Sequence, residues 1–325
     1  MDELEAFKRN INLSEYAAAQ GYALDTKASS RNSKVMRDAR GDKIVIARGE
    51  DGHWIYFSVR DVSDNGTIID FVQQRDGVRL GGVRRRLRPW IGGDPGLLRP
   101  APALFAQQIT AVCKDRAQVL GELARMKTLA YHRYLEEERQ IPRALLQSPR
   151  FAGRIRIDRR MNVIFPHADA DGPCGYEIKN RHFTGFAPGG EKGLWFSAAR
   201  AGDKALVIAE TGIDALSYAV LHPHDNARYA SIAGAMNPGQ PDLLRAAAAR
   251  MGQGAAILIA TDNDPDGRKL ADQIAAAIQQ AGRSDLRIVR ALPQGEGEDW
   301  NDRLRDATRS TKSGTTHAPG LRPAT

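Results

Sequence analysis

Two apolar runs in the second half of the chain have the length and composition of buried strands, and each ends at acidic residues. The first run, residues 205–209, ends at Glu210. The second run, residues 255–260, is followed by three acids in alternate positions: Asp262, Asp264 and Asp266. A segment with helical periodicity follows each run. The pattern therefore predicts two strand–acid–helix repeats in one α/β unit with a parallel sheet.

The pattern of apolar positions differs in the rest of the chain. Helical spacing covers residues 3–22, two short strands follow within residues 43–59, and a long helical segment covers residues 103–139 after a stretch rich in Pro and Gly. From residue 154 apolar and polar residues alternate, which is typical of an antiparallel meander. The last residues are rich in Ser, Thr, Gly and Pro without periodicity, which is typical of a disordered tail.

These changes divide the chain into five parts. We expect a small α+β domain (1–92), a Pro/Gly-rich linker with a helical region (93–150), a small antiparallel β meander (151–202), an α/β domain with a parallel sheet and flanking helices (203–308) and a disordered tail (309–325). The fold class is therefore α/β.

Positive charge exceeds negative charge and is unevenly placed. The 325 residues include 47 Lys and Arg against 39 Asp and Glu, a formal net charge of +8. One basic zone lies on a predicted helix and contains Arg84, Arg85, Arg86 and Arg88. A second zone contains Arg143, Arg150, Arg154, Arg156, Arg159 and Arg160. Basic zones beside an acidic site favour a polyanionic partner, and compositional bias is the alternative interpretation.

The cysteines and the N-terminus indicate the compartment. Cys113 and Cys174 stand far apart, without a His or a second Cys at metal-ligand spacing, so neither a zinc site nor a disulfide framework is expected. The first ten residues are charged and do not resemble a signal peptide. No apolar run has the length of a membrane span. We expect a cytoplasmic protein with no membrane partner.

The acids that follow the two strands predict a metal site. Ligands of α/β sheets bind at the carboxyl ends of the strands, where these acids should converge. Several carboxylates do not stay ionised together at pH 7 without a cation. Mg²⁺ prefers oxygen ligands and leaves room for substrate phosphates. We expect four residues to bind Mg²⁺, with Mn²⁺ as an alternative: Glu210, Asp262, Asp264 and Asp266.

The order of these motifs closely resembles the Toprim domain, which bacterial-type primases, topoisomerases and some nucleases share. The resemblance rests on Glu210, Asp214 on the next helix, Gly234 in SIAG, and the Asp262-x-Asp264 pair. It implies that the two aspartates of the pair hold Mg²⁺. It also implies that Glu210 either completes the metal shell or acts as a general base.

The segments before residue 203 resemble those of primases. Residues 151–200 are similar to the primase segment that precedes Toprim. The N-terminal hairpin, Gly turn and IDF helix resemble the zinc-binding domain of bacterial primases, but Tyr56, Phe57, Ser58 and Val59 stand where that family has metal ligands. We therefore expect a degenerate domain without zinc, in which His53 is a turn residue. The whole order resembles the primase-like proteins of plasmids and other mobile elements.

The primase resemblance also implies nucleotide contacts. Lys179, Arg181 and Lys192 lie where primases place basic nucleotide contacts, although Glu177 stands where their pattern usually has Arg. A second group, Asp299 and Asn301, lies in an acidic D-W-N segment and would reach the metal or a triphosphate. Asp299 would alternatively be the N-cap of the following helix.

Together these residues predict a Mg²⁺-dependent enzyme, a primase-like nucleotidyltransferase that synthesises primers on single-stranded DNA from NTPs. The four arginines of residues 84–88 would follow the template backbone, and Trp54 and Tyr56 would stack on bases if they are not core residues. The alternatives are a Toprim nuclease and a non-catalytic DNA-binding accessory protein of a mobile element. A topoisomerase is disfavoured because the chain is short and has no evident tyrosine domain. A replicative helicase or a mobilisation protein is a further candidate partner.

Overall fold

The computed structural model describes residues 3–26, 28–30, 33–49, 51–61, 64–91, 114–181 and 183–314. The chain forms two compact units, Met1–Asp115 and Arg116–Thr325. Residues 93–113 of the predicted linker and residues 315–325 of the predicted tail lie outside the described residues. No helix in the described ranges is long and apolar enough to cross a membrane.

The first unit is an antiparallel sheet packed against helices. Its strands are β1 (Ala23–Asp25), β2 (Ser33–Arg37), β3 (Lys43–Arg48), β4 (Trp54–Ser58) and β5 (Asn65–Thr67), and they pair in that order. Its helices are α1 (Glu3–Asn10), α2 (Leu13–Ala19), α3 (Ile68–Asp76) and α4 (Leu80–Ile91). The helix predicted over residues 3–22 is divided in two, because the Asn12 side chain accepts the N–H of Ser14 and begins a new helix.

Two aromatic residues of β4 are part of the core of the first unit. Trp54 and Tyr56 are both buried, so neither forms the base-stacking surface that the sequence left open. The Tyr56 hydroxyl donates to Asp64 over 2.5 Å, and Asp64 pairs with Arg75 over 2.7 Å. His53, in the turn before β4, contacts Glu5 and Asp51 through its two ring nitrogens.

The second unit begins with short elements and an antiparallel sheet. The elements are α5 (Arg116–Arg125), β6 (Lys127–Thr128), the π-helix η2 (Tyr134–Glu138), α6 (Arg143–Gln147), β7 (Arg156–Ile157), β8 (Val163–Asp169), β9 (Gly172–Asn180) and β10 (Phe183–Phe186). The sheet has the order β10-β9-β8-β7-β6. Of the helix expected over 103–139, the described part is α-helical in α5 and wrong beyond Arg125, where β6 and η2 follow.

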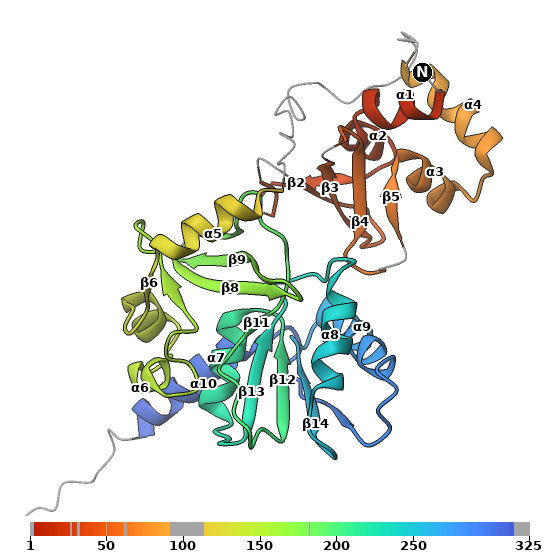
Figure 1. Ribbon diagram of the computed structural model, residues 1–325. Helices are drawn as coiled ribbons and strands as arrows, with labels where there is room; N and C mark the ends of the chain where they lie inside the picture. The colour runs from red at the N-terminus through yellow and green to blue at the C-terminus, as the bar shows by residue number, and fades with distance from the viewer. Residues whose placement is uncertain are drawn as a thin grey trace, which may run out of the picture. The chain divides into compact units, whose positions relative to one another are not determined.

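The chain then enters a mostly parallel sheet of order β11-β13-β12-β14-β15 (Figure 1). Its elements are β11 (Trp195–Phe196), β12 (Ala205–Ala209), α7 (Gly212–Leu221), β13 (Ala227–Ser231), α8 (Gln240–Ala249), β14 (Ala256–Ala260), α9 (Pro265–Gln279), β15 (Arg287–Arg290) and α10 (Trp300–Gly314). Only β11 runs antiparallel to its neighbour. α10 continues past residue 308, so part of the predicted tail is helical.

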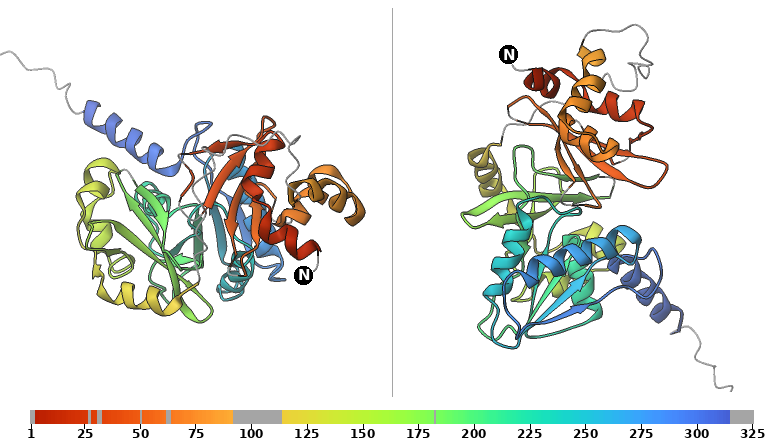
Figure 2. Two further views of the ribbon diagram at one scale, coloured as in Figure 1. Left: turned by 90° about the horizontal axis from the view of Figure 1, so that it is seen from above. Right: turned by 90° about the vertical axis from the view of Figure 1, so that its right-hand side faces the viewer.

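The order of the strands places helices on both faces of this sheet. β12 connects to β13 on one side, and the chain then crosses back to β14 on the other side of β12. Right-handed connections therefore place α7 and α8 on opposite faces. α10 packs with α7, and α9 packs with α8 (Figures 1 and 2). The connections diverge between β12 and β14, and ligands of such folds bind at this point.

The two sheets of the second unit share one apolar core. Phe165 of β8 packs edge-to-face on Trp195 of β11, with ring centroids 5.3 Å apart.

Arg150, from the second basic zone, is buried and binds Asp203, with Nη2 2.6 Å from Oδ1, and it also donates to two backbone carbonyls. Arg150 is therefore structural and not part of a phosphate-binding surface.

Candidate active site

Glu210 lies at the carboxyl end of the central strand β12. In the parallel register Ala209 is opposite Ala260 of β14, so Glu210 leaves its strand at the level of Thr261. Two interactions hold the backbone here. The N–H of Gly234 donates to the carbonyl of Glu210 over 3.0 Å, and the Thr211 side chain caps α7. The SIAG segment and the Glu210 loop are therefore adjacent.

The loop after β14 carries the aspartate pair. The side chain of Asn263 donates to the carbonyls of Pro293 and Gly295, both over 3.1 Å, and therefore faces the segment before α10. Asp264 is the N-cap of α9, with Oδ1 accepting the N–H of Gly267 over 2.6 Å. Asp266 lies in the first turn of α9.

Gly267 permits the close turn between β14 and α9. A Cβ atom at this position would lie 2.3 Å from the carbonyl oxygen of Asp262, which is a backbone atom and cannot rotate away. We expect Gly267→Ala to displace the aspartate loop and to lower the free energy of unfolding by about 1–3 kcal/mol. Urea denaturation measures the loss. Gly252→Ala, where the added Cβ meets nothing within 4 Å, is the control and should change stability much less.

The segment before α10 brings a further acid to the same edge. Arg268 pairs with Glu296, Nη2 to Oε1 over 2.9 Å, so its guanidinium fastens this segment to α9. Asp299 follows, and its Oδ1 accepts the N–H of Asp302 over 2.6 Å. Asp299 is therefore the N-cap of α10. It also acts electrostatically on Asp262 and Asp214, so it belongs to the acidic cluster too.

The electrostatics show that the acids gather at one place. Burial, helped by four neighbouring carboxylates, raises the pKa of Asp262 to about 9; these carboxylates belong to Glu210, Asp214, Asp299 and Asp264. Burial and the charge of Asp299 raise the pKa of Asp214 to about 7. Burial also raises the pKa of Asp299. Such mutual repulsion is typical of carboxylates that share a cation or a proton.

Two lysines and a glutamate from the neighbouring segments complete the site. Lys179 of β9 is buried and pairs with Glu177 over 3.0 Å, and Glu177 also accepts the N–H of Gly212 at the start of α7 over 3.1 Å. Lys192 donates to the carbonyl of Ala235 over 3.2 Å. Burial lowers the pKa of Lys192 to about 8, although Glu177 and Glu210 act in the opposite direction.

Sequence reasoning did not include Glu177 and Asp214 among the site residues. Glu177 was noticed only as a departure from the primase pattern, yet it lies two residues from Lys179 on the same face of β9. Asp214 was quoted as part of the motif without a role. One signal in the sequence could have identified Asp214 as a site residue. It is an acid on the buried face of a helix, and that helix directly follows the strand that ends at Glu210.

The donor atoms at this edge fit a hard cation. The Oδ1 atom of Asp262 and the Oγ1 atom of Thr261 are buried without a hydrogen-bond partner in the described part of the chain. Within the same described residues, however, no three Asp, Glu, His or Cys side chains are placed to hold a metal ion together. The carboxylates of Glu210, Asp262 and Asp264 nevertheless lie at one edge of the sheet. Their oxygen chemistry suits Mg²⁺.

Two predicted nucleotide ligands have other contacts. Asn301 is buried, and its amide donates to Ser217 and to the carbonyl of Arg139, so it joins α10 to α7 and η2. Arg181 pairs with Glu138 on the surface and lines a separate pocket. The structure gives Asn301 a packing role, while Lys179 and Lys192 lie with the acids.

The arginines predicted to bind DNA lie on α4 in the first unit, and most of them have acidic partners. Arg84 and Arg88 both pair with Glu3, over 3.3 and 2.7 Å, and Arg86 pairs with Asp76 over 2.9 Å. Arg85 is exposed. Exposed ion pairs contribute little stability and exchange partners readily, so a DNA-binding role for this helix stays a prediction.

Comparisons with known proteins agree with this architecture. Residues 207–304 match the family described as Toprim-like, and residues 133–204 match a family described as "Protein of unknown function (DUF3991)". Residues 207–304 are a Toprim-like domain. The Toprim-like match contains Glu210, Asp262, Asp264 and Asp299, and it confirms the predicted fold. None of the curated proteins searched matches the chain.

The solved structures that the chain matches include primase domains. A DNA primase domain from Pseudomonas aeruginosa is 19% identical, with a TM-score of 0.35, and the match covers 49% of this chain and 52% of that one. The primase fragment of the bacteriophage T7 primase-helicase protein is 17% identical, with a TM-score of 0.35, over 55% of this chain and 72% of that one. The chain therefore spans about half the length of the Pseudomonas structure that it matches.

Proposed function

We propose that this protein is a Mg²⁺-dependent primase-like nucleotidyltransferase that synthesises oligonucleotide primers on single-stranded DNA from nucleoside triphosphates. The observation that carries the proposal is the grouping of acids and lysines at one edge of the Toprim-like sheet. Glu210, Asp262 and Asp264 come from two adjacent parallel strands, and Lys179 and Lys192 approach from the preceding segment.

Each group has a role that follows from its surroundings. Asp262, Asp264 and Glu210 would hold Mg²⁺, which when bound neutralises charge on the transferred phosphate. Lys192, whose pKa is about 8, still carries a proton on most molecules at pH 7 and would attract the triphosphate. Glu177 keeps Lys179 charged and fixes the start of α7. The attacking hydroxyl would lose its proton to Glu210 if this residue is not itself a ligand.

A role in the replication of a plasmid or another mobile element is part of the proposal. It is supported by the order of the segments, in which an N-terminal α+β domain without metal-binding cysteines precedes the primase-like meander and the Toprim-like domain. A replicative helicase or a mobilisation protein would be the matching partner.

A single assay tests the activity. A labelled single-stranded DNA template is incubated with Mg²⁺ and NTPs, and the products are separated by length. We expect new oligonucleotides from the wild type and none from the double variant Asp262→Ala, Asp264→Ala. Shortening of the template would instead identify a nuclease, and retention of unchanged DNA would identify an accessory binding protein. Synthesis by the double variant would show that the site is wrongly assigned.

A further inference from the structure

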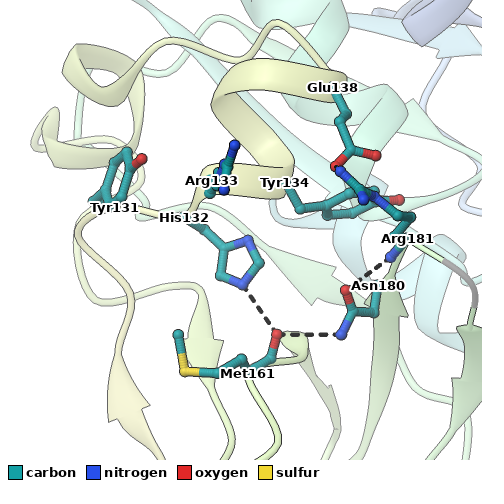
Figure 3. A pocket seen from close by; sticks show the side chains of 8 residues that line it. All are labelled: Tyr131, His132, Arg133, Tyr134, Glu138, Met161, Asn180 and Arg181. Carbon is teal, nitrogen blue, oxygen red and sulfur yellow. Dashed lines mark hydrogen bonds and ion pairs between the residues drawn. The ribbon is translucent and has the colours of Figure 1, made fainter.

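A pocket is lined by residues of the DUF3991 segment and by the two residues that precede it, and none of the carboxylates of the candidate active site lines it. Its volume is about 430 Å³, within the range of small-ligand sites. The residues that matter for its chemistry are Tyr131, His132, Arg133, Met161, Asn180 and Arg181 (Figure 3). They come from the segment that contains η2, from the turn between β7 and β8, and from the end of β9.

The pocket presents two large apolar side chains to solvent. Tyr131 is 45% exposed and Met161 is 61% exposed. Met161 has a φ of 59°, which is uncommon for a residue with a side chain. Its carbonyl oxygen is held by His132 Nε2 over 3.0 Å and by Asn180 Nδ2 over 3.4 Å (Figure 3). A strained residue held by two side chains is typical of a built site.

The imidazole of His132 has one nitrogen that contacts the backbone and one that does not. His132 is buried, and its Nε2 donates to the Met161 carbonyl. Nδ1 has no hydrogen-bond partner among residues 114–181 or elsewhere in the described chain. Nδ1 is itself buried, so the contribution of His132 to the pocket is to hold the Met161 carbonyl in place.

Several arginines lie beside the exposed tyrosine or line the same pocket. The guanidinium of Arg143 lies 5.6 Å from the centre of the Tyr131 ring. Arg133 pairs with Glu137 over 2.7 Å, and Arg181 pairs with Glu138. Both pairs are exposed, so a phosphate can replace the carboxylate at little cost. The turn before Met161 adds two exposed arginines, Arg159 and Arg160, which form no ion pair with the described residues.

We propose that this pocket binds one nucleotide of single-stranded DNA, with the base stacked on Tyr131 beside Met161 and a phosphate on Arg133 and Arg181. Arg159 and Arg160 would contact the next phosphates. Aromatic rings set among cations are the usual means of binding a single strand without sequence preference. The inference deepens the proposed function, on which the choice of DNA as the natural ligand rests. The pocket would hold the template outside the carboxylate site.

The first test measures binding without Mg²⁺ or NTPs, so that it does not depend on catalysis. Fluorescence anisotropy follows labelled oligo-dT and, in a second arm, oligo-U of the same length. We expect Tyr131→Ala to weaken oligo-dT binding about tenfold, since stacking on one base contributes ~1–3 kcal/mol. Arg133→Ala should weaken binding. It should also reduce the slope of log affinity against log salt concentration by about one, because one phosphate contact is lost.

Matched exposed residues away from the pocket serve as controls. Leu120→Ala removes a side chain with 42% exposure from α5, and Arg245→Ala breaks an exposed pair with Asp242 on α8. Both variants should bind like the wild type. Equal binding by Tyr131→Ala and the wild type would overturn the proposal. Tighter binding of oligo-U than of oligo-dT, lost in Tyr131→Ala, would overturn the assignment to DNA.

A second test locates the base directly. Oligo-dT carrying 5-iodouracil is irradiated with the wild-type protein, and the cross-linked peptide is identified by mass spectrometry. We expect the link on Tyr131, and links only outside the pocket would contradict the proposal. If the wild type forms this link but synthesises no primer, the pocket stands and the proposed function fails. If primers are made while Tyr131→Ala binds normally, the function stands and the pocket fails.

Discussion

Replacement of Asp262 by Asn is expected to abolish primer synthesis and, in the absence of metal, to stabilise the fold. Activity should fall because the proposed metal ligand loses its charge. Stability should rise by on the order of 1–3 kcal/mol, because the substitution removes a buried carboxylate from a group of like charges and its Oδ1 has no hydrogen-bond partner within the described ranges.

The pH dependence of this stabilisation has a definite sign. The pKa of Asp262 rises to about 9 in the folded chain, from a usual value near 4. A carboxyl whose folded pKa is raised favours the folded state below its unfolded pKa, and this advantage is lost as the pH rises toward the folded value. The gain from Asp262→Asn should therefore grow between about pH 4 and pH 9.

Thermal unfolding with EDTA at several pH values measures the effect. Asp242→Asn, at an exposed position of α8, is the control, and its stability should stay close to that of the wild type at every pH. Addition of Mg²⁺ should raise the melting temperature of the wild type more than that of Asp262→Asn. A variant that is less stable than the wild type at pH 8 would show that the acids are not in mutual repulsion.

Replacement of Glu177 by Ala is expected to destabilise the fold by about 3–5 kcal/mol, because it leaves a buried charge without its partner. Glu177 is 2% exposed and Lys179 is 9% exposed. The substitution also removes the acceptor of the Gly212 N–H, which fixes the loop after Glu210. Primer synthesis should therefore decrease even at temperatures at which the variant remains folded.

A double variant separates loss of the charge pair from loss of packing. When Lys179→Met is added to Glu177→Ala, the uncompensated buried cation is removed, so a large part of the lost stability should return. Guanidinium denaturation measures the free energy of unfolding of each variant. If the double variant is no more stable than Glu177→Ala alone, the pair does not make the contribution assigned to it here.

The acids could be predicted from the sequence because their positions depend on few factors. A buried parallel strand ends at a known edge of its sheet, so Glu210 and Asp262 were bound to lie close once β12 and β14 were neighbours. The role of Asp264 was harder to predict, because an aspartate before Pro265 is both a natural N-cap and a candidate metal ligand. The structure shows the cap.

Other features depend on contacts that no local pattern records. Asn301 looked like a ligand, but its amide joins three segments of the second unit. Arg150 looked like part of a phosphate-binding zone, but it is buried beside Asp203. The helix expected over 103–139 ends at Arg125 in the described chain, since Lys127 and Thr128 extend the antiparallel sheet instead. In each case a tertiary partner determined the outcome.

The bonds of Asn263 have a practical consequence for shortening the protein. Its backbone N–H donates to the carbonyl of Glu298 over 3.0 Å, its own carbonyl accepts the N–H of Gly297 over 2.7 Å, and its side chain reaches Pro293. The loop that carries the aspartates is thus supported by a segment that follows the last strand. A truncated version that stops at β15 would keep every strand of the sheet. It would still lose the segment that supports the loop carrying Asp262 and Asp264. The smallest piece worth expressing must therefore extend at least through Glu298.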